Sequence, residues 1–475
     1  MVLKHGVTNT LLPTPVRTIG TLANPVAYIG TARTGGQAAG TFAASANKWE
    51  RLQTRAEALA WLGEDSASTQ VPMSMTERAD GYTVPGFLSA FHDDNNLADI
   101  LVYNATPTTD ITDESKTFVS GNATLLKGYV EDLTVTDSAG TTTYVENKDY
   151  TFVHKTGVVS RVDGGGLSAG ATVLVDYTHA TSAVASLGAA DIVAAMTAKD
   201  SIFQQHEVVP SMFIAPTFEN LTADATHTVI AALKTAKTLN DSLFVSRAIV
   251  GIEGADSDDI QDTILSAIAT TDADLDYAAH PAFGTSKLTG AEMYALIWSK
   301  LATSNNGFIG QEPASNKLTA GIVPNAPFTD SAGNILNALG INTFVSFKGL
   351  RTWGNYTSKY DESGDFMDNF ASIRFLFNNY LNNVAAYSRE YMVDIGGDMK
   401  KIQFHVDTMN SNIIGKLVRS GALLKGSKIT LNPADNPIED LLLGKYVFGH
   451  ALGFKPPVTH VQNNFWYEVS LLTAI

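Results

Sequence analysis

The residues of this sequence that come nearest to a metal site are His206 and Glu207. The run His206-Glu207-Val208-Val209-Pro210 begins like the zinc motif in which two histidines four residues apart share one face of a helix. Pro210 occupies the position of the second histidine. The sequence therefore predicts no zinc centre at this point.

A second stretch has part of the spacing of a phosphate-binding loop. Gly421 and Gly426 are separated like the two glycines of that loop, but Ser427 and Lys428 follow them in the reverse order. The stretch also comes after an expected helix, whereas a phosphate-binding loop comes before one. No G-x-G-x-x-G dinucleotide motif occurs in the chain. We therefore expect no nucleotide and no other cofactor.

The remaining chemically capable residues have ordinary structural interpretations. Asp258 and Asp259 could attract calcium, but they open an expected helix, where carboxylates favour the positive end of the helix dipole. Gly164-Gly165-Gly166 is expected to form a hairpin turn. His280 and His405 are expected to be packed or surface histidines. With no catalytic, cofactor-binding or metal-binding residues marked, we expect a protein that is not an enzyme.

Composition narrows the class of protein further. A chain of 475 residues predicts two to four domains. The net charge of −16 and the lack of any run rich in lysine and arginine disfavour nucleic-acid binding. The absence of cysteine excludes a disulfide framework and a thiolate metal site. No apolar run reaches the length of a membrane span, and the N-terminal sequence lacks the pattern of a signal peptide, so we expect synthesis in a cytoplasm without membrane insertion.

The first half of the chain shows a change in pattern. Residues 1–24 contain Pro13 and Pro15 and little helical periodicity, which predicts an extended arm. A buried strand at 24–31, a helix at 56–62 and a strand at 98–103 follow. Residues 106–186 are then rich in Thr, Val, Gly and Asp, with short alternating runs at 129–135, 150–154, 157–162 and 172–177. Such runs predict a small β-sandwich or barrel, inserted into the chain with its two ends close together.

From residue 189 the chain alternates strands and helices. Strands are expected at 208–215, 244–252 and 276–280, and helices at 226–239, 257–269 and 290–302. This alternation is typical of a mostly parallel sheet covered by helices. We therefore predict a mixed α/β (α+β), multi-domain chain with an α/β core, an inserted small all-β domain and extended terminal arms.

Two long amphipathic helices are expected near the C-terminus. Asp365 caps the first and Asp398 the second, which stops at Gly421. The apolar face of the first carries Phe366, Phe370, Ile373, Phe377, Tyr380, Val384 and Tyr387. The apolar face of the second carries Met399, Ile402, Val406, Met409, Ile413 and Leu417, while Lys401, Asn412, Lys416 and Arg419 share another face.

The end of the chain has the pattern of a strand without a partner. Strands are expected at 427–431 and 444–450, after which Pro456-Pro457 detaches the last segment. Within 465–475 the side chains alternate, and one face carries Phe465, Tyr467, Val469 and Leu471. An unpaired strand of this kind needs the edge of another sheet.

The stretch 339–360 precedes the two long helices in the chain. Its helix ends at Gly340, where a positive φ is easily adopted, and a β run follows from Ile341 to Phe347. Lys348-Gly349 breaks the run, and Trp353 is expected to fill a buried corner. The stretch contains no acid, base and nucleophile at a recognisable spacing, so it is expected to be structural.

This stretch also carries a family resemblance. The residues Leu-Gly-Ile-Asn-Thr, followed by Gly-Leu-Arg-Thr-Trp-Gly-Asn-Tyr-Thr, resemble the segment by which contractile phage tail sheath proteins are recognised. Tyr356 stands where that family usually has arginine. The family's order of a long helix, a second helix, a strand and a C-terminal arm is present here. The resemblance covers residue 210 to the C-terminus well and residues 7–31 weakly.

The resemblance implies a structural function. Sheath subunits polymerise as stacked hexameric rings around a tail tube and contract to drive the tube through the host envelope. The implied partners are other copies of the chain, the tail tube protein, and the baseplate and tail terminator proteins, in a virion assembled in the host cytoplasm. Terminal arms that add strands to neighbours' sheets would keep such a polymer linked during rigid-body rotation.

The resemblance also directs attention to particular residues. Candidate inter-subunit arms are residues 1–24, with Val7, and 465–475, with Phe465, Tyr467, Val469 and Leu471. The family implies that one C-terminal helix touches the tube, and the helix at 398–420 fits because Lys401, Lys416 and Arg419 project from a common face. The alternative explanation is that these three cations form a solvated face near the C-terminus of the helix, where positive charge is favoured.

The expected domain organisation follows from these patterns. We predict an N-terminal arm at 1–24, a first core part at 25–104, an inserted β domain at 105–186, a second core part at 187–460 and a C-terminal arm strand at 461–475. Two other functions stay open. One is an α/β enzyme active on glycans with the β insert as a binding module, and the other is a surface-layer or adhesin protein.

Overall fold

The computed structural model describes the chain in two compact units. It describes all residues except 1–24, 33–47, 63–81, 107, 129, 154–155, 181–188, 217–227, 255–259, 261–273, 282–287, 306–307, 318–327, 362–363, 396, 398 and 460–475. The larger unit comprises residues 23–382 and 454–475, and the smaller unit comprises residues 1–22 and 383–453. The boundary falls within helix α12 (Ala371–Tyr391).

The larger unit is built on an eight-stranded sheet in the order β15-β14-β13-β12-β11-β1-β3-β2. The six inner strands pair in parallel, and an antiparallel strand closes each edge. Parallel strands buried on both faces are expected to be continuous apolar runs, as Val26–Gly30 is. The strands are β1 (Val26–Gly30), β2 (Trp49–Leu52), β3 (Ile100–Asn104), β11 (Met212–Ile214), β12 (Arg247–Gly254), β13 (Leu275–Pro281), β14 (Ile341–Ser346) and β15 (Leu350–Trp353).

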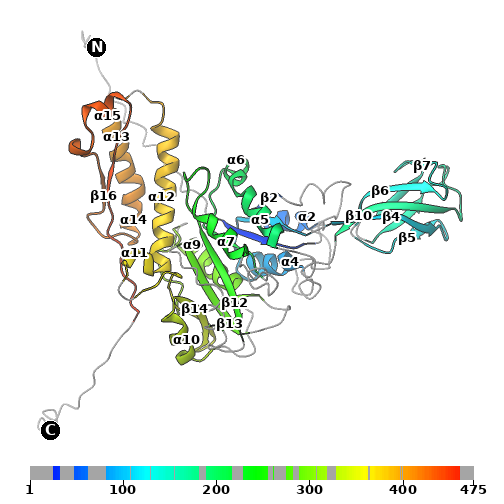
Figure 1. Cartoon of the computed structure of the whole chain (residues 1–475), viewed down its shortest axis with the longest axis horizontal. Coiled ribbons are helices and arrows are strands. Elements are labelled where there is room, and N and C mark those ends of the chain that lie inside the picture. Colours follow the sequence, from blue (N-terminus) through cyan, green and yellow to red (C-terminus); the bar gives the residue numbers. More distant parts are fainter. Residues whose placement is uncertain are drawn as a thin grey trace, which may run out of the picture. The chain divides into compact units, whose positions relative to one another are not determined.

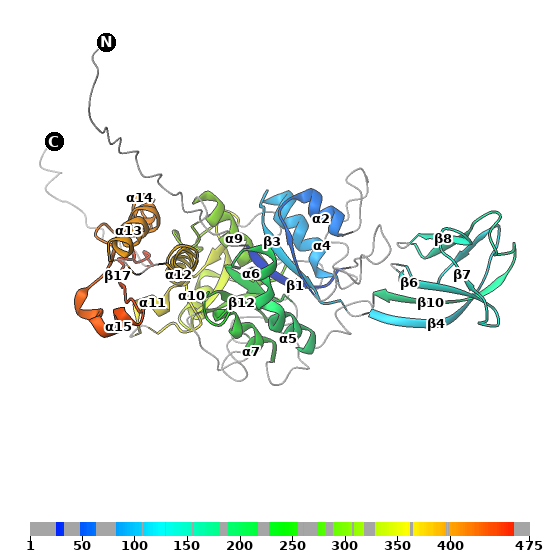
Figure 2. The ribbon, with the colours of Figure 1, turned by 90° about the horizontal axis from the view of Figure 1, so that it is seen from above.

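Helices cover both faces of this sheet (Figures 1 and 2). One face packs under α2 (Arg55–Trp61), α4 (Thr83–Leu88) and α9 (Gly290–Ser304), through a core that includes Tyr28, Phe87 and Trp298. Helices α5 (Ala189–Thr197), α6 (Ser201–His206) and α7 (Thr228–Lys234) lie on the other side. Short helical segments complete the unit: η1 (Ser89–Asp94), η2 (Ala198–Asp200), η3 (Thr235–Lys237), α10 (Asp330–Asn337) and α11 (Phe366–Asn369). The mixed α/β fold class predicted from the sequence is confirmed.

Residues 108–180 form two small antiparallel sheets of their own (Figure 2). Their apolar side chains, among them Val135, Tyr150 and Val175, make a separate core. One sheet has the order β4-β10-β6-β7, and its first and last strands in the chain are neighbours, with Thr108 opposite Ala180. The boundaries of an inserted domain stay a prediction. The strands are β4 (Thr108–Thr117), β5 (Asn122–Thr124), β6 (Val130–Asp137), β7 (Thr143–Tyr144), β8 (Tyr150–Val153), β9 (Val158–Arg161) and β10 (Thr172–Ala180).

The smaller unit contains a long helical rod and a two-stranded sheet. The rod consists of α13 (Met399–Met409), a π-helical segment η5 (Asn410–Ile414) and α14 (Gly415–Arg419). The expected apolar face of this rod is buried except at its first residue, Met399, which is 46% exposed because the core of the unit begins one turn later, at Ile402. The sheet pairs β16 (Lys428–Thr430) with β17 (Gly449–Ala451), and η6 (Pro433–Asp435) and α15 (Ile438–Leu442) lie between these strands in the chain.

Two expected elements differ from the structure, and one strand was not expected. The helix expected from Phe366 is two helices, because Phe370 is extended and bridges Tyr356, so the apolar face starts afresh in α12. The strand expected at 444–450 is limited to Gly449–Ala451, because Asn436 occupies the main-chain groups of Val447. Strand β2 was not anticipated. The helix expected at 257–269 and the Asp398 cap lie outside the described residues, apart from Ile260.

Candidate functional site

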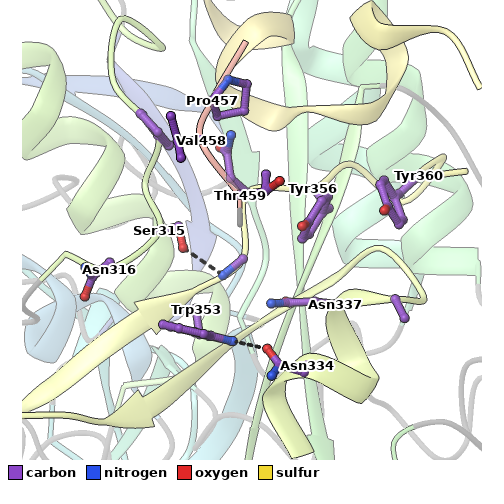
Figure 3. A pocket seen from close by; sticks show the side chains of 14 residues that line it. Ser315, Asn316, Asn334, Asn337, Trp353, Tyr356, Tyr360, Pro457, Val458 and Thr459 are labelled. Carbon is purple, nitrogen blue, oxygen red and sulfur yellow. Dashed lines mark hydrogen bonds between the residues drawn. The ribbon is translucent and has the colours of Figure 1, made fainter. Parts of the chain in front are cut away.

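A cavity of about 400 Å³ lies in the larger unit, at the corner that follows β15 (Figure 3). Its floor is the chain from Trp353 to Tyr356, and one wall is the end of α10. A cavity of this size is in the range that takes small molecules or short peptide segments. The lining residues are uncharged: Pro313, Ser315, Asn316, Asn334, Asn337, Ala338, Trp353, Gly354, Asn355, Tyr356, Tyr360, Pro457, Val458 and Thr459.

The floor of the cavity is held in place by hydrogen bonds to its walls. Trp353 Nε1 donates to Asn334 Oδ1 at 2.9 Å, and the Gly354 amide donates to Ser315 Oγ at 3.1 Å. Trp353 is therefore half-buried on the cavity surface, and the expectation that it fills a buried corner is wrong. Gly354 has φ +112°, and a Cβ there would lie 2.4 Å from Asn337 Oδ1. Only glycine fits this position without strain.

Aromatic and amide groups face the open space. The rings of Tyr356 and Tyr360 lie 4.4 Å apart, centroid to centroid, and burial raises the pKa of the Tyr356 hydroxyl. Within the described part of the chain, neither this hydroxyl nor the side-chain amide of Asn316 makes a hydrogen bond. The cavity thus offers both apolar rings and unused polar groups to an occupant.

The C-terminal segment of the chain reaches this cavity. The Phe454 ring packs edge-to-face on Phe377, with centroids 6.1 Å apart. Pro457, Val458 and Thr459 then form the upper wall in Figure 3. The two prolines Pro456 and Pro457 restrict the backbone between these points. Thr459 is the last residue that the structure describes.

The two-stranded sheet of the smaller unit has unequal edges. On the outer edge of β16, Asn410 Nδ2 donates to the Ile429 carbonyl at 2.8 Å and Asn410 Oδ1 accepts from the Ile429 amide at 2.7 Å. These contacts occupy the main-chain groups that another strand would use. Among the described residues, β17 has a strand partner on one side only. An added strand would therefore find β17 the more accessible edge.

The three cations proposed to face a tail tube lie on the helical rod of the smaller unit. Lys401 is exposed on α13, and Lys416 and Arg419 lie on α14, half-buried and exposed respectively. Lys401 and Arg419 form no ion pair within the described residues. The π-helical segment between Lys401 and Lys416 changes the helical phase, which sequence spacing could not reveal. The contact with a tube stays a prediction.

The arm residues named from the sequence lie outside the described residues. These are Val7, Phe465, Tyr467, Val469 and Leu471.

The stretches rejected as a zinc motif and as a phosphate-binding loop lie at positions that suit neither kind of site. His206 Nε2 lies 3.0 Å from the Trp49 carbonyl, and Gly421 and Gly426 both have positive φ in the connection after α14. One motif was overlooked in the sequence, where no nucleophile elbow was expected: Gly166-Leu167-Ser168-Ala169-Gly170 has the G-x-S-x-G spacing of a hydrolase elbow. It lies between β9 and β10 rather than between a strand and a helix, which does not fit such an elbow. In the described residues no cluster of three or more His, Asp or Glu side chains is arranged to hold a metal.

A cluster of buried charges lies elsewhere in the larger unit. Arg247, which is fully buried, contacts Asp276 on the neighbouring strand and lies 3.4 Å from Asp274. Arg374 of α12 binds Asp274 through two hydrogen bonds of 2.6 and 3.2 Å. Burial raises the pKa of Asp276 to about 6, against the opposing effect of the Arg247 guanidinium. The cluster joins strand and helix, and none of its residues lines the cavity beside Trp353.

Comparison with known proteins places this geometry in context. The tail sheath protein of Burkholderia phage BcepMu is 26% identical over 412 residues, which cover 80% of this chain and 83% of that protein. The sheath of the extracellular contractile injection system PVC, solved in its contracted state, matches 99% of both chains with a TM-score of 0.54 and 11% identity. The sheath tail protein from Desulfitobacterium hafniense matches 95% of this chain and 100% of its own, with a TM-score of 0.54 and 11% identity.

These comparisons confirm the resemblance to contractile tail sheath proteins and the fold class. The related proteins are structural sheath proteins, and no family of enzymes is indicated. A family model described as a protein of unknown function matches residues 75–195, which include the two small sheets. Among the described helices, none combines the length and the apolar character needed to cross a bilayer.

Proposed function

We propose that this chain is the subunit of a contractile tail sheath, which polymerises around a tail tube and shortens to drive that tube through a cell envelope. The observation that carries the proposal is the relation to a phage tail sheath protein over four-fifths of both chains. The match of the fold, across almost the whole chain, to an injection-system sheath and to a sheath tail protein supports it. Subunits stacked as hexameric rings, a virion location and assembly in the host cytoplasm belong to the same proposal.

The chemistry of the described site supports a structural function over a glycan-active enzyme. Glycoside hydrolysis generally uses a pair of carboxylates beside the sugar. None of the fourteen residues that line the cavity is acidic.

The work of contraction is proposed to come from subunit packing rather than from a bound nucleotide. A polymer that shortens by rotating its subunits needs links that survive the rotation. Strand addition provides such links, because main-chain hydrogen bonds hold a segment whose own body moves behind a hinge. The C-terminal segment 465–475, with Phe465, Tyr467, Val469 and Leu471 on one face, and the N-terminal segment with Val7 are the proposed arms. Strand β17, which pairs with one strand in the described part of the chain, is the proposed receiving strand.

The test of this proposal is removal of residues 465–475. Each main-chain hydrogen bond is worth about 1 kcal/mol net, and burial of Phe465 and Tyr467 about 1.5–3 kcal/mol each. The truncated chain should stay a folded monomer by circular dichroism and light scattering, while the full chain forms tubular polymers visible by electron microscopy. Normal polymers from the truncated chain would refute the arm.

The proposed partner inside the polymer is the tail tube protein, contacted by Lys401, Lys416 and Arg419. Exposed charges give weak, salt-sensitive contacts, which allow a sheath to release its tube during contraction. Changing the three residues together to Glu should weaken assembly on tubes and spare polymerisation of the sheath alone. The matched control changes Lys237, Lys300 and Lys348 to Glu, which alters the net charge equally at exposed positions that belong neither to the rod nor to the β16–β17 sheet. Unchanged assembly on tubes at low salt would exclude this face.

A further inference from the structure

The cavity beside Trp353 has no occupant in the proposed function, and its chemistry indicates one. All of its lining residues are uncharged, and amides and tyrosines dominate the polar part. Such a surface suits a segment that is itself uncharged and rich in amides, because charged groups would lose solvation there without an opposite charge to compensate. The unused Tyr356 hydroxyl and Asn316 amide can each hydrogen-bond to a peptide.

The described part of the chain ends at the rim of this cavity. Pro457, Val458 and Thr459 line its rim, and the next five residues are His460, Val461, Gln462, Asn463 and Asn464. Three of these five residues, Gln462, Asn463 and Asn464, carry side-chain amides. Residues 465–475, in contrast, are mostly apolar and include Glu468. An extended residue spans about 3.3–3.6 Å, so two or three residues suffice to pass from Thr459 into the cavity.

We propose that residues 460–464 of the same chain bind in this cavity. We call residues 460–464 the root of the C-terminal segment, and their binding in the cavity the seat. The seat fixes the point and the direction from which residues 465–475 depart. Ordering the root within the subunit lowers the entropy lost when the distal part binds elsewhere. The link to polymer assembly rests on the proposed function, but the seat itself is a property of the single chain.

The absence of cysteine from the chain allows a direct test by engineered disulfides. Asn337→Cys, on the cavity wall, is combined in the full-length chain with Val461→Cys, Gln462→Cys or Asn463→Cys. A disulfide forms only when the two Cα atoms come within about 7 Å. At least one pair should give an intramolecular disulfide in dilute monomer, detected as a cross-linked peptide by mass spectrometry. The matched control is Ile335→Cys, which is exposed on the same helix but does not line the cavity.

The outcomes of the disulfide test are distinct. Cross-linking through Asn337→Cys at least tenfold above the Ile335→Cys control supports the seat. Equal cross-linking of both would overturn it, because the segment would then have no preferred position. Disulfides only between subunits would also overturn it, in favour of a neighbour's segment as the occupant.

A pair of truncations provides a second measurement that needs no substitution in the cavity. Removal of residues 460–475 should speed hydrogen exchange of the amides at 353–360 at least threefold, because the occupant is lost. Removal of residues 465–475 alone should leave that exchange unchanged. Equal exchange in both truncations and the full chain would contradict the seat. If the second truncation polymerises normally while exchange behaves as expected, the seat stands and the proposed arm fails.

Discussion

Six asparagines among the described residues each make a pair of hydrogen bonds to the main chain of one distant residue, as a residue of a paired β-strand does. Each side-chain amide donates to the carbonyl and accepts from the amide of that residue, with distances from 2.6 to 3.3 Å. An amide side chain can do this because it carries a donor and an acceptor side by side. Corners without regular structure are thereby held at two points. The pairs are Asn104–Ala32, Asn342–Tyr356, Asn369–Asp361, Asn382–Val245, Asn410–Ile429 and Asn436–Val447.

Replacement of the amide by a carboxylate should break one of the two hydrogen bonds of such a clamp, because a carboxylate accepts but does not donate. In Asn382→Asp the donor to the Val245 carbonyl is lost, and a buried negative charge faces that carbonyl instead. We expect the free energy of unfolding to fall by about 2–4 kcal/mol, measured by urea denaturation at pH 7. Asn316→Asp, at an exposed residue without a side-chain partner in the described chain, should change it by less than about 0.5 kcal/mol. Equal effects would show that the clamp contributes nothing.

Glycine at the cavity floor gives a second residue-scale prediction. Gly354 and Gly426 have similar φ values, +112° and +103°, but only Gly354 has atoms where a Cβ would go. Gly426→Ala should cost only the backbone strain, about 1 kcal/mol, while Gly354→Ala adds a clash with Asn337 and should cost about 2–4 kcal/mol. Thermal unfolding of both variants measures the difference. A Gly354→Ala chain as stable as Gly426→Ala would contradict the close contact between the floor and α10.

At the scale of elements, polar contacts fasten the first half of α12 to the parallel sheet. Arg374 and Asn378 both bind Asp274, and Arg247 lies over the Phe375 ring at 4.7 Å. Asp276, on β13, is fully buried beneath them and keeps one carboxylate oxygen without a hydrogen bond among the described residues. A buried network of this kind gives α12 one defined position, because any shift would leave charges unpaired.

The raised pKa of Asp276 makes this junction sensitive to pH. The pKa of an aspartate in the unfolded chain is about 3.9, whereas burial raises the pKa of Asp276 in the folded chain to about 6. The folded state therefore binds the extra proton between these values, and this contribution to stability is full below pH 4 and lost as pH rises through 6. The stability of the natural chain minus that of Asp276→Asn should fall by up to about 3 kcal/mol between pH 4 and 6.5.

The control for this experiment titrates in the other direction. Hydrogen bonds from Thr141 lower the pKa of the Asp137 carboxylate to about 2, so its contribution is lost only as pH falls from 4 towards 2. Asp137→Asn should therefore show a constant difference from the natural chain between pH 4 and 6.5. A constant difference for Asp276→Asn as well would mean that the buried carboxylate is not protonated in the folded state.

At the scale of the whole molecule, residues 108–180 depend on their own core. Their two sheets pair only among themselves in the described chain, and their apolar residues form a separate cluster. The pairing of Thr108 with Ala180 brings both ends of the segment to adjacent strands. Cross-strand neighbours of this kind have Cα atoms about 5 Å apart, a gap that a short linker can close.

Replacement of residues 108–180 by a linker of about six Gly and Ser residues should leave the rest of the chain folded. Circular dichroism should show a loss of β signal only, and the larger unit should unfold within a few degrees of its original midpoint. Polymers of the shortened chain should form as before, with a smaller outer diameter by electron microscopy if the segment is an outer domain. Insoluble expression would show instead that these strands complete the main core.

Sequence patterns predicted the parts of this fold that depend on residues close together in the chain. Alternation and periodicity located the parallel strands from Val26 to Ser346 and the rod that ends at Arg419, because burial dictates those patterns. The break at Phe370 was missed because it depends on a bridge to Tyr356, a contact between segments that no local window contains. Strand β2 was missed because Trp49–Leu52 carries charged residues suited to a sheet edge. The cavity was missed for a related reason: its walls come from four separate segments.

The side-by-side ends of the segment 108–180 have a consequence for how such a chain can change over generations. The segment follows β3 and precedes α5 in the chain, and its two ends lie on adjacent strands. For the rest of the chain it therefore makes the same connection that one short loop would make. Its length, shape and surface can be exchanged in a single recombination step without shifting the register of any strand in the eight-stranded sheet. The chain therefore combines the eight-stranded sheet with a segment that could be replaced while the rest of the fold is kept.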